Sequence, residues 1–323
     1  MKQLRHCLFF LACTMLVGAA VPAAADEARL TAVSFLPLSV NFGALFKRWV
    51  DAVNDRGKGV LQISAIGPDA MPPTEQANAL KNGVVQMGFV AATYYVGMMW
   101  EGEVLPLGEK PMKELRANGA WGYLDKLHRE KLNAVLLGQI GDGVKMFIYT
   151  TRPATSDSAD KPMDGMSLRS VPIYKPFFDA LGARTISMPP GEVYTALERN
   201  LVQGYGWPMW GLKDMGWLSV TKYRYGPGFL GANTPILVNQ DAWNRLSERQ
   251  REFLQNMALW LDDEWPKWRA ERDAEEGELQ AAASVKYIDM GPGFAKRAND
   301  LRWAELQSHS PQHIPHLRKL MTN

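Results

Sequence analysis

Residues 164–210 constrain the fold most, because their pattern predicts the order strand, helix, strand, helix, strand. The two helices are expected over 176–181 and 191–199, with apolar strand-like runs before, between and after them. Alternation of this kind is typical of an open α/β sheet, in which ligands bind beyond the carboxyl ends of the strands. The stretch therefore predicts both a fold class and the edge at which a ligand site would lie.

A cation and two aromatic residues are expected at that edge. Arg169 comes at the end of the first strand, and Tyr205 and Trp207 at the end of the third. A guanidinium can hold a carboxylate with two parallel hydrogen bonds while a ring covers the apolar remainder. An arginine in an apolar strand can equally be neutralised by an internal Asp or Glu. The residues alone are compatible with two alternatives for Arg169, a site for a small organic anion or a structural ion pair.

The same alternation occurs earlier, over 29–91, where 84–91 reads as a buried strand. Residues 75–86 align with 192–203, with Glu, Ala, Leu, Val and Gln coinciding in register. This match predicts one αβ unit used once in each of two similar lobes, the alternative being a chance match of two short helices. Two lobes whose strand ends face each other form a cleft, which is the usual place for a ligand.

The first 25 residues have the features of a secretion signal. Lys2 and Arg5 precede an apolar run over 7–17, and three alanines come before Asp26. The run is too short to span a bilayer, so we expect cleavage and a periplasmic product. Both cysteines leave with the signal, and the 36 basic residues fall by two to 34, which equals the 34 acidic residues. A neutral chain argues against nucleic acid as a partner.

Several motifs together resemble the substrate-binding proteins of TRAP transporters, the DctP-type family. The matching residues are Asp164–Arg169, Leu181–Ala183, Glu192–Leu197 and Val202–Gly204. Asn200 and Gln203 depart from the Gly and Asp that are usual in the family. The resemblance implies an α/β clamshell of two lobes, with mixed sheets flanked by helices and a long helix spanning both lobes.

The expected lobes are discontinuous in sequence. Lobe I is predicted to comprise 26–142 plus 232–272, and lobe II to comprise 143–231 plus 273–323. A long helix is expected from Ser247 to about 283, interrupted at Pro266. The last fifteen residues contain two prolines and are predicted to form a loosely held tail.

The resemblance also implies roles for single residues. In that family the arginine that matches Arg169 holds the substrate carboxylate. Lys145 stands where many members have a second arginine, so it is a candidate contact, with an ordinary surface lysine as the alternative. Trp207 and Ala91 replace an asparagine and a glutamate of the sialic-acid binders, which favours a less hydroxylated acid, such as a keto, branched or aromatic one.

Further candidates could complete the wall of the site. Aromatic residues are more often core than binding surface, and an asparagine before a strand is often a turn residue, so these positions have a structural alternative as well. The additional candidates are Tyr94, Asn233, Pro190 and Tyr205, together with Tyr95 and Phe89.

We therefore expect an extracytoplasmic receptor that closes on a small organic acid and delivers it to TRAP membrane permease subunits. No cofactor and no chemistry on the ligand are expected.

One alternative is a binding protein for another importer or a sensor. Another is a secreted enzyme, which would need an acid–base pair near Arg169. The few histidines, with no Gly-x-Ser-x-Gly motif, disfavour a Ser-His-Asp hydrolase. Prolines between His309, His313 and His316 disfavour a metal site.

Overall fold

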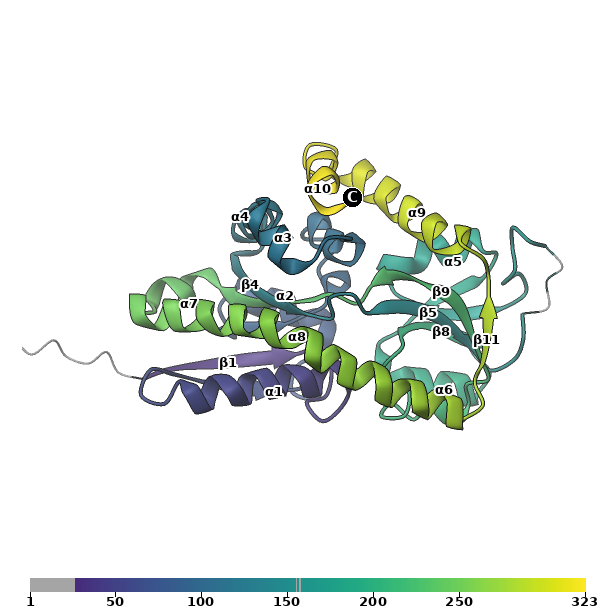
Figure 1. Cartoon of the computed structure of the whole chain (residues 1–323), viewed down its shortest axis with the longest axis horizontal. Helices are drawn as coiled ribbons and strands as arrows, with labels where there is room; N and C mark the ends of the chain where they lie inside the picture. Colours follow the sequence, from purple (N-terminus) through teal and green to yellow (C-terminus); the bar gives the residue numbers. More distant parts are fainter. Residues whose placement is uncertain (1–26, 155, 157) are drawn as a thin grey trace, which may run out of the picture.

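The computed structural model describes residues 27–154, 156 and 158–323. The predicted signal segment, 1–25, lies outside these residues. Figure 1 shows two α/β lobes side by side, each built around one sheet, with helix α8 running along both. Both sheets are mixed and flanked by helices, which confirms the predicted fold class.

The sheet of the first lobe has the strand order β2-β1-β3-β10-β4. Strand β1 is parallel to β2 and β3, and β10 is antiparallel to both of its neighbours. The strands are β1 (Ala28–Ser34), β2 (Leu61–Ile66), β3 (Met87–Phe89), β4 (Ala134–Ile140) and β10 (Thr234–Asn239).

The sheet of the second lobe has the order β11-β9-β5-β8-β6-β7. Its parallel core, β7-β6-β8, comes from the 164–210 stretch, whose predicted alternation of strands and helices is confirmed. The strands are β5 (Lys145–Thr150), β6 (Ser167–Ser170), β7 (Arg184–Ser187), β8 (Gly204–Pro208), β9 (Tyr223–Gly231) and β11 (Lys286–Asp289).

Helices cover the faces and the ends of the two sheets. Those that precede α8 are α1 (Asn41–Arg56), α2 (Pro73–Lys81), η1 (Ala92–Tyr94), η2 (Trp100–Leu107), α3 (Met112–Ala117), α4 (Ala120–Leu132), η3 (Pro172–Tyr174), α5 (Lys175–Ala180), η4 (Pro190–Glu192), α6 (Val193–Glu198), η5 (Trp217–Ser219) and α7 (Gln240–Arg245). They are followed by α8 (Glu248–Ala282), α9 (Gly293–His309) and α10 (Ile314–Met321). None of the helices in the described ranges combines the length and apolar character that crossing a membrane requires.

The long helix α8 is continuous through Pro266, so the predicted interruption is wrong. Buried Trp265 and Trp268 anchor it on both sides of the proline, and the Trp265 indole N–H donates to the Asp142 carbonyl. These tertiary contacts outweigh the hydrogen bond that proline cannot donate. A capping box at Ser247 begins the helix.

The carboxyl-terminal residues are docked, which corrects the predicted loose tail. Helix α10 buries Ile314, Leu317 and Met321, and it contacts η2 and α4 as well as α9. The Met321 carbonyl also accepts a hydrogen bond from the backbone N–H of Glu109. Proline at the start of this helix is compatible with helical structure, because the first N–H groups of a helix have no intrahelical partner.

Strand β3 is shorter than predicted. Only 87–89 form the strand, and Val84 is 67% exposed in the turn before it. An apolar run cannot by itself distinguish a buried strand from an apolar turn. The short strand still brings residues 91–94 to the carboxyl edge of the first sheet, where the chain faces the second lobe.

Candidate functional site

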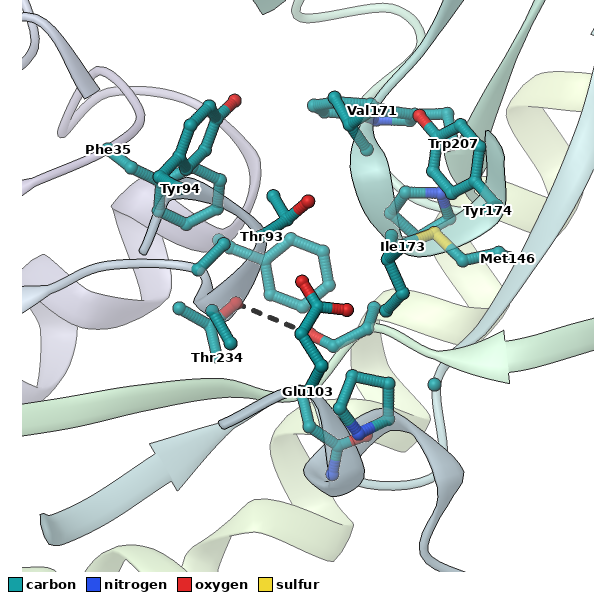
Figure 2. Close-up of a pocket in the computed structure, with 18 of the residues that line it drawn as sticks. Phe35, Thr93, Tyr94, Glu103, Met146, Val171, Ile173, Tyr174, Trp207 and Thr234 are labelled. Carbon is teal, nitrogen blue, oxygen red and sulfur yellow. Dashed lines mark hydrogen bonds between the residues drawn. The ribbon is translucent and has the colours of Figure 1, made fainter. Parts of the chain in front are cut away.

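A cavity of about 70 Å³ lies between the two lobes. The first lobe lines it with residues that follow β1 and β3, such as Phe35 and Tyr94, and the second with residues at the ends of β6 and β8, such as Arg169 and Trp207. In Figure 2 the labelled residues of the two lobes face each other across the cavity. This is the predicted location, at the carboxyl ends of parallel strands.

Arg169 lines this cavity from β6 and is 1% exposed. Its Nε donates to the Met188 carbonyl at 3.0 Å, and its Nη1 donates to the Tyr174 hydroxyl at 2.6 Å. Within the described residues, no carboxylate lies close enough to form an ion pair with it. Arg169 therefore does not form the structural ion pair with a described Asp or Glu that the sequence allowed. Its positive charge remains beside the cavity.

Two tyrosine hydroxyls surround this charge. The pKa of Tyr174 is raised to about 12, and that of Tyr94 is also raised, in both cases because burial disfavours the phenolate. The nearby Arg169 guanidinium offsets part of each increase. Both hydroxyls are therefore protonated at neutral pH and do not neutralise the arginine.

Trp207 forms part of the wall beside Arg169. The guanidinium carbon of Arg169 lies 5.7 Å from the centre of the Trp207 ring system, within the range of a cation–π contact. The indole N–H donates to the Trp210 carbonyl, and the ring packs edge-on against Trp217 at 4.7 Å. These contacts fix the ring as a rigid apolar wall.

Asn233 lines the cavity where the chain returns from β9 to β10. Its side-chain nitrogen lies 3.3 Å from Gln139 Oε1 and 3.4 Å from Asp142 Oδ1, to which it donates. The amide is thus held from outside the cavity by two acceptors. The structure brings four of the predicted site residues together in this cavity: Arg169, Trp207, Tyr94 and Asn233.

Five other predicted residues do not line the cavity, and two of them, Tyr95 and Phe89, are buried in the hydrophobic core. Lys145 is exposed at the start of β5, and its neighbour Met146 lines the cavity instead, because successive side chains of a strand point to opposite faces. Tyr205 is two residues before Trp207, roughly 7 Å further from the strand end, and its hydroxyl pairs with Thr221. Pro190 is buried at the start of η4.

Glu103 also lines the cavity, although the sequence pattern did not single it out. Its side chain is completely buried, and burial raises the pKa of its carboxyl group. Oε2 lies 3.0 Å from Nη2 of Arg302, which belongs to helix α9. The only local sign of its role was its position directly before an apolar run, Val104–Leu107.

The carboxyl-terminal histidines are packed against aromatic rings. His309 stacks on Trp100 with ring centres 3.6 Å apart, and His313 Nδ1 lies 2.8 Å from the Tyr123 hydroxyl. In the part of the chain that the structure describes, no three His, Cys, Asp or Glu side chains are grouped so as to hold a metal ion.

Comparisons with known proteins agree with this architecture. The model of the family described as "Bacterial extracellular solute-binding protein, family 7" matches residues 34–292. The monocarboxylate 2-oxoacid-binding periplasmic protein of Nostoc sp. is 23% identical over 262 residues, which cover 77% of this chain and 70% of that protein.

Solved structures have the same fold. A TRAP periplasmic solute-binding protein from Desulfovibrio salexigens with bound orotic acid has a TM-score of 0.79 and 18% identity, covering 91% of this chain and 97% of its own. One from Colwellia psychrerythraea with bound calcium and pyruvate has a TM-score of 0.75 and 20% identity, covering 92% and 93%. The chain therefore belongs to family 7 of the bacterial extracellular solute-binding proteins, the DctP-type substrate-binding proteins of TRAP transporters.

Proposed function

We propose that this protein binds a small organic acid between its lobes, with Arg169 pairing with the ligand carboxylate, and delivers it to TRAP permease subunits. The observation that carries the proposal is a buried arginine that lines a cavity and has no ion-pair partner among the described residues. A buried cation without a counter-ion is costly, so a carboxylate entering the cavity is attracted to it. Such a charge-assisted pair contributes roughly 1.5–3 kcal/mol.

The wall of the cavity favours an acid with few hydroxyl groups. Phe35, Met146, Val171 and Ile173 present carbon and sulfur rather than hydrogen-bonding groups. A sugar acid would leave several hydroxyls unpaired against this wall. A volume of about 70 Å³ has room for several water-sized groups, since one needs roughly 10–15 Å³. We infer a compact keto, branched or aromatic carboxylate.

The two lobes supply different parts of the site, so a bound ligand links them. Arg169 and Trp207 come from the second lobe, and Tyr94 from the first. A ligand that contacts both lobes binds the closed form more tightly and shifts the population toward it. Only this form is expected to dock productively on the permease. A binding protein for another importer would use the same site, and co-purification with TRAP permease subunits distinguishes the two.

The role of receptor is favoured over that of an enzyme by the surroundings of Glu103, the one Asp or Glu among the described residues that lines the cavity. Glu103 is paired with Arg302 and forms no ion pair with Arg169. An acid–base pair for catalysis would need two titratable groups within reach of one reacting atom. The geometry instead supports binding without chemical change.

A thermal-shift screen of organic acids tests the proposal. A ligand at one hundred times its dissociation constant adds about 2.7 kcal/mol to the stability of the folded state. We expect 2-oxoacids, branched acids or aromatic acids to raise the melting temperature, and polyhydroxylated sugar acids to leave it unchanged. A screen in which no carboxylate raises the melting temperature would contradict the proposal, and stabilisation by sugar acids alone would contradict the ligand class.

A further inference from the structure

The cavity has an acidic group as well as a basic one. Figure 2 shows the Glu103 carboxylate directed into the space between Thr93 and Ile173, and all three residues line the cavity. Arg169 lies elsewhere on the wall, beside Tyr174 and Trp207, and forms no ion pair with Glu103. A ligand in this cavity therefore meets a positive and a negative group at different places.

The Glu103 carboxylate has unused hydrogen-bonding capacity. Neither of its oxygens has a partner in good hydrogen-bond geometry among the described residues, although the side chain is fully buried and the Thr93 hydroxyl and the Arg302 guanidinium lie close enough to lower its pKa. The contact with Arg302 at 3.0 Å compensates its charge, but lacks the geometry of a hydrogen bond. A buried acceptor without a donor costs free energy, so such a group calls for an explanation.

A neighbouring acid shows the difference. Glu101 lies in the same helix, η2, and is equally buried. It does not line the cavity, and its Oε1 accepts hydrogen bonds from Lys131 and from Ser310. Glu101 thus has two well-formed hydrogen bonds from protein donors, whereas the donors near Glu103, Thr93 and Arg302, are not in good hydrogen-bond geometry.

Resting on the proposed function, we infer that Glu103 is a second recognition group, which accepts a hydrogen bond from a donor on the ligand. The donor would lie at the end of the acid away from the carboxylate held by Arg169. Glu103 would also repel a carboxylate placed at the wrong end and so fix the ligand's orientation.

The charges nearby favour a neutral donor. Arg302 already compensates Glu103, and a ligand carboxylate would compensate Arg169. Glu305 also pairs with Arg302, but its side chain is partly exposed, so water screens its charge and it adds little inside the buried site. An ammonium group beside Glu103 would leave a surplus positive charge in a buried site, whereas a hydroxyl or amide N–H would not. The inferred substrate class is a compact carboxylate with one distal hydroxyl or amide N–H, which agrees with a largely apolar wall.

Matched ligands test this inference on the wild-type protein. Isothermal titration calorimetry would compare the straight-chain acids from propanoate to hexanoate with their ω-hydroxy and ω-amino counterparts, and phenylacetate with 4-hydroxyphenylacetate. For the chain length that fits, we expect the hydroxy acid to bind roughly 10- to 100-fold more tightly than its parent acid, since Glu103 accepts from it. The inference would be overturned if the parent acids bind as tightly as the hydroxy acids, or if the ω-amino acids bind more tightly than the ω-hydroxy acids.

Glu103→Gln gives a second readout. It should abolish most of the preference for the hydroxy acid and change the affinity for the parent acid by less than about threefold. Glu101→Gln is the control, because it alters an equally buried carboxylate outside the cavity and should preserve the preference. Equal weakening of both ligands by Glu103→Gln would indicate a structural role and contradict the inference. If no carboxylate binds the wild-type protein at all, the proposed function itself fails.

Discussion

Arg169 Nη1 donates a hydrogen bond of 2.6 Å to the Tyr174 hydroxyl, which in turn donates to the Gly206 carbonyl at 2.9 Å. The tyrosine comes from η3, directly after the strand that carries the arginine. The hydroxyl thus connects the guanidinium to the backbone of β8 and limits the directions in which the guanidinium can point. A cation oriented in advance loses less entropy when it binds a carboxylate.

Tyr174→Phe should therefore weaken carboxylate binding. Removing one orienting hydrogen bond costs about 1 kcal/mol, or roughly a fivefold loss of affinity. Isothermal titration calorimetry with the best acid from the screen measures the effect. Tyr205→Phe is the matched control, since its hydroxyl is also buried but pairs with Thr221 outside the cavity. Equal affinities for wild type and Tyr174→Phe would show that Arg169 needs no such support.

Buried His128 should make the protein less stable in mild acid. Burial lowers the pKa of His128 to about 4 from an ordinary 6.5. Its Nδ1 contacts the Leu124 carbonyl and its Nε2 contacts the Tyr95 hydroxyl, which together suit one neutral tautomer. Below pH 6.5 the unfolded chain binds a proton that the folded chain does not. Stability is therefore lost as the pH falls from 6.5 to 4, by roughly 3 kcal/mol from this group.

Urea unfolding at pH 7, 5.5 and 4.5 checks this prediction. The wild-type free energy of unfolding should fall more steeply than that of His128→Gln over this range, although the variant is less stable at pH 7. His316→Gln is the control, because that histidine is exposed. Parallel pH profiles for wild type and His128→Gln would contradict the assigned protonation state.

Leu317→Ala tests the docking of the carboxyl-terminal helix. Leu317 is fully buried, so its truncation should lower the free energy of unfolding by about 2–5 kcal/mol. Lys319→Ala, on the exposed face of the same helix, should change it by less than about 0.5 kcal/mol. Chemical denaturation of both variants measures the difference. A negligible effect of Leu317→Ala would support the loose tail that the sequence predicts.

Local sequence patterns predicted the architecture well where the signal is periodic. The alternation over 164–210 gave the parallel core of the second sheet, and the position of Arg169 at the end of β6 followed from it. Periodicity did not show how far along a strand the cavity begins. Tyr205 and Trp207 lie on the same face of β8, but only the later residue reaches the cavity. The face of β5 that meets the ligand depends on the neighbouring strands, so Lys145 could not be distinguished from Met146.

Other features of the site depend on contacts between distant parts of the chain. Glu103 is stabilised by Arg302 of α9, and no local pattern links these two residues. The same holds for the last helix, whose apolar face is buried by η2 and α4. Prolines near the terminus indicated irregular structure, and packing against residues far away in the sequence overrode this local preference.

The pairing of Arg169 with a ligand carboxylate is tested most directly by calorimetric titration of Arg169→Ala with the tightest-binding acid of the wild-type screen. Arg184→Ala serves as the control, since this exposed arginine lies on the adjacent strand β7 and does not line the cavity. We predict that Arg169→Ala stays folded and loses roughly 10- to 100-fold or more in affinity, while Arg184→Ala binds as the wild type does. Wild-type affinity in a folded Arg169→Ala protein would contradict the account.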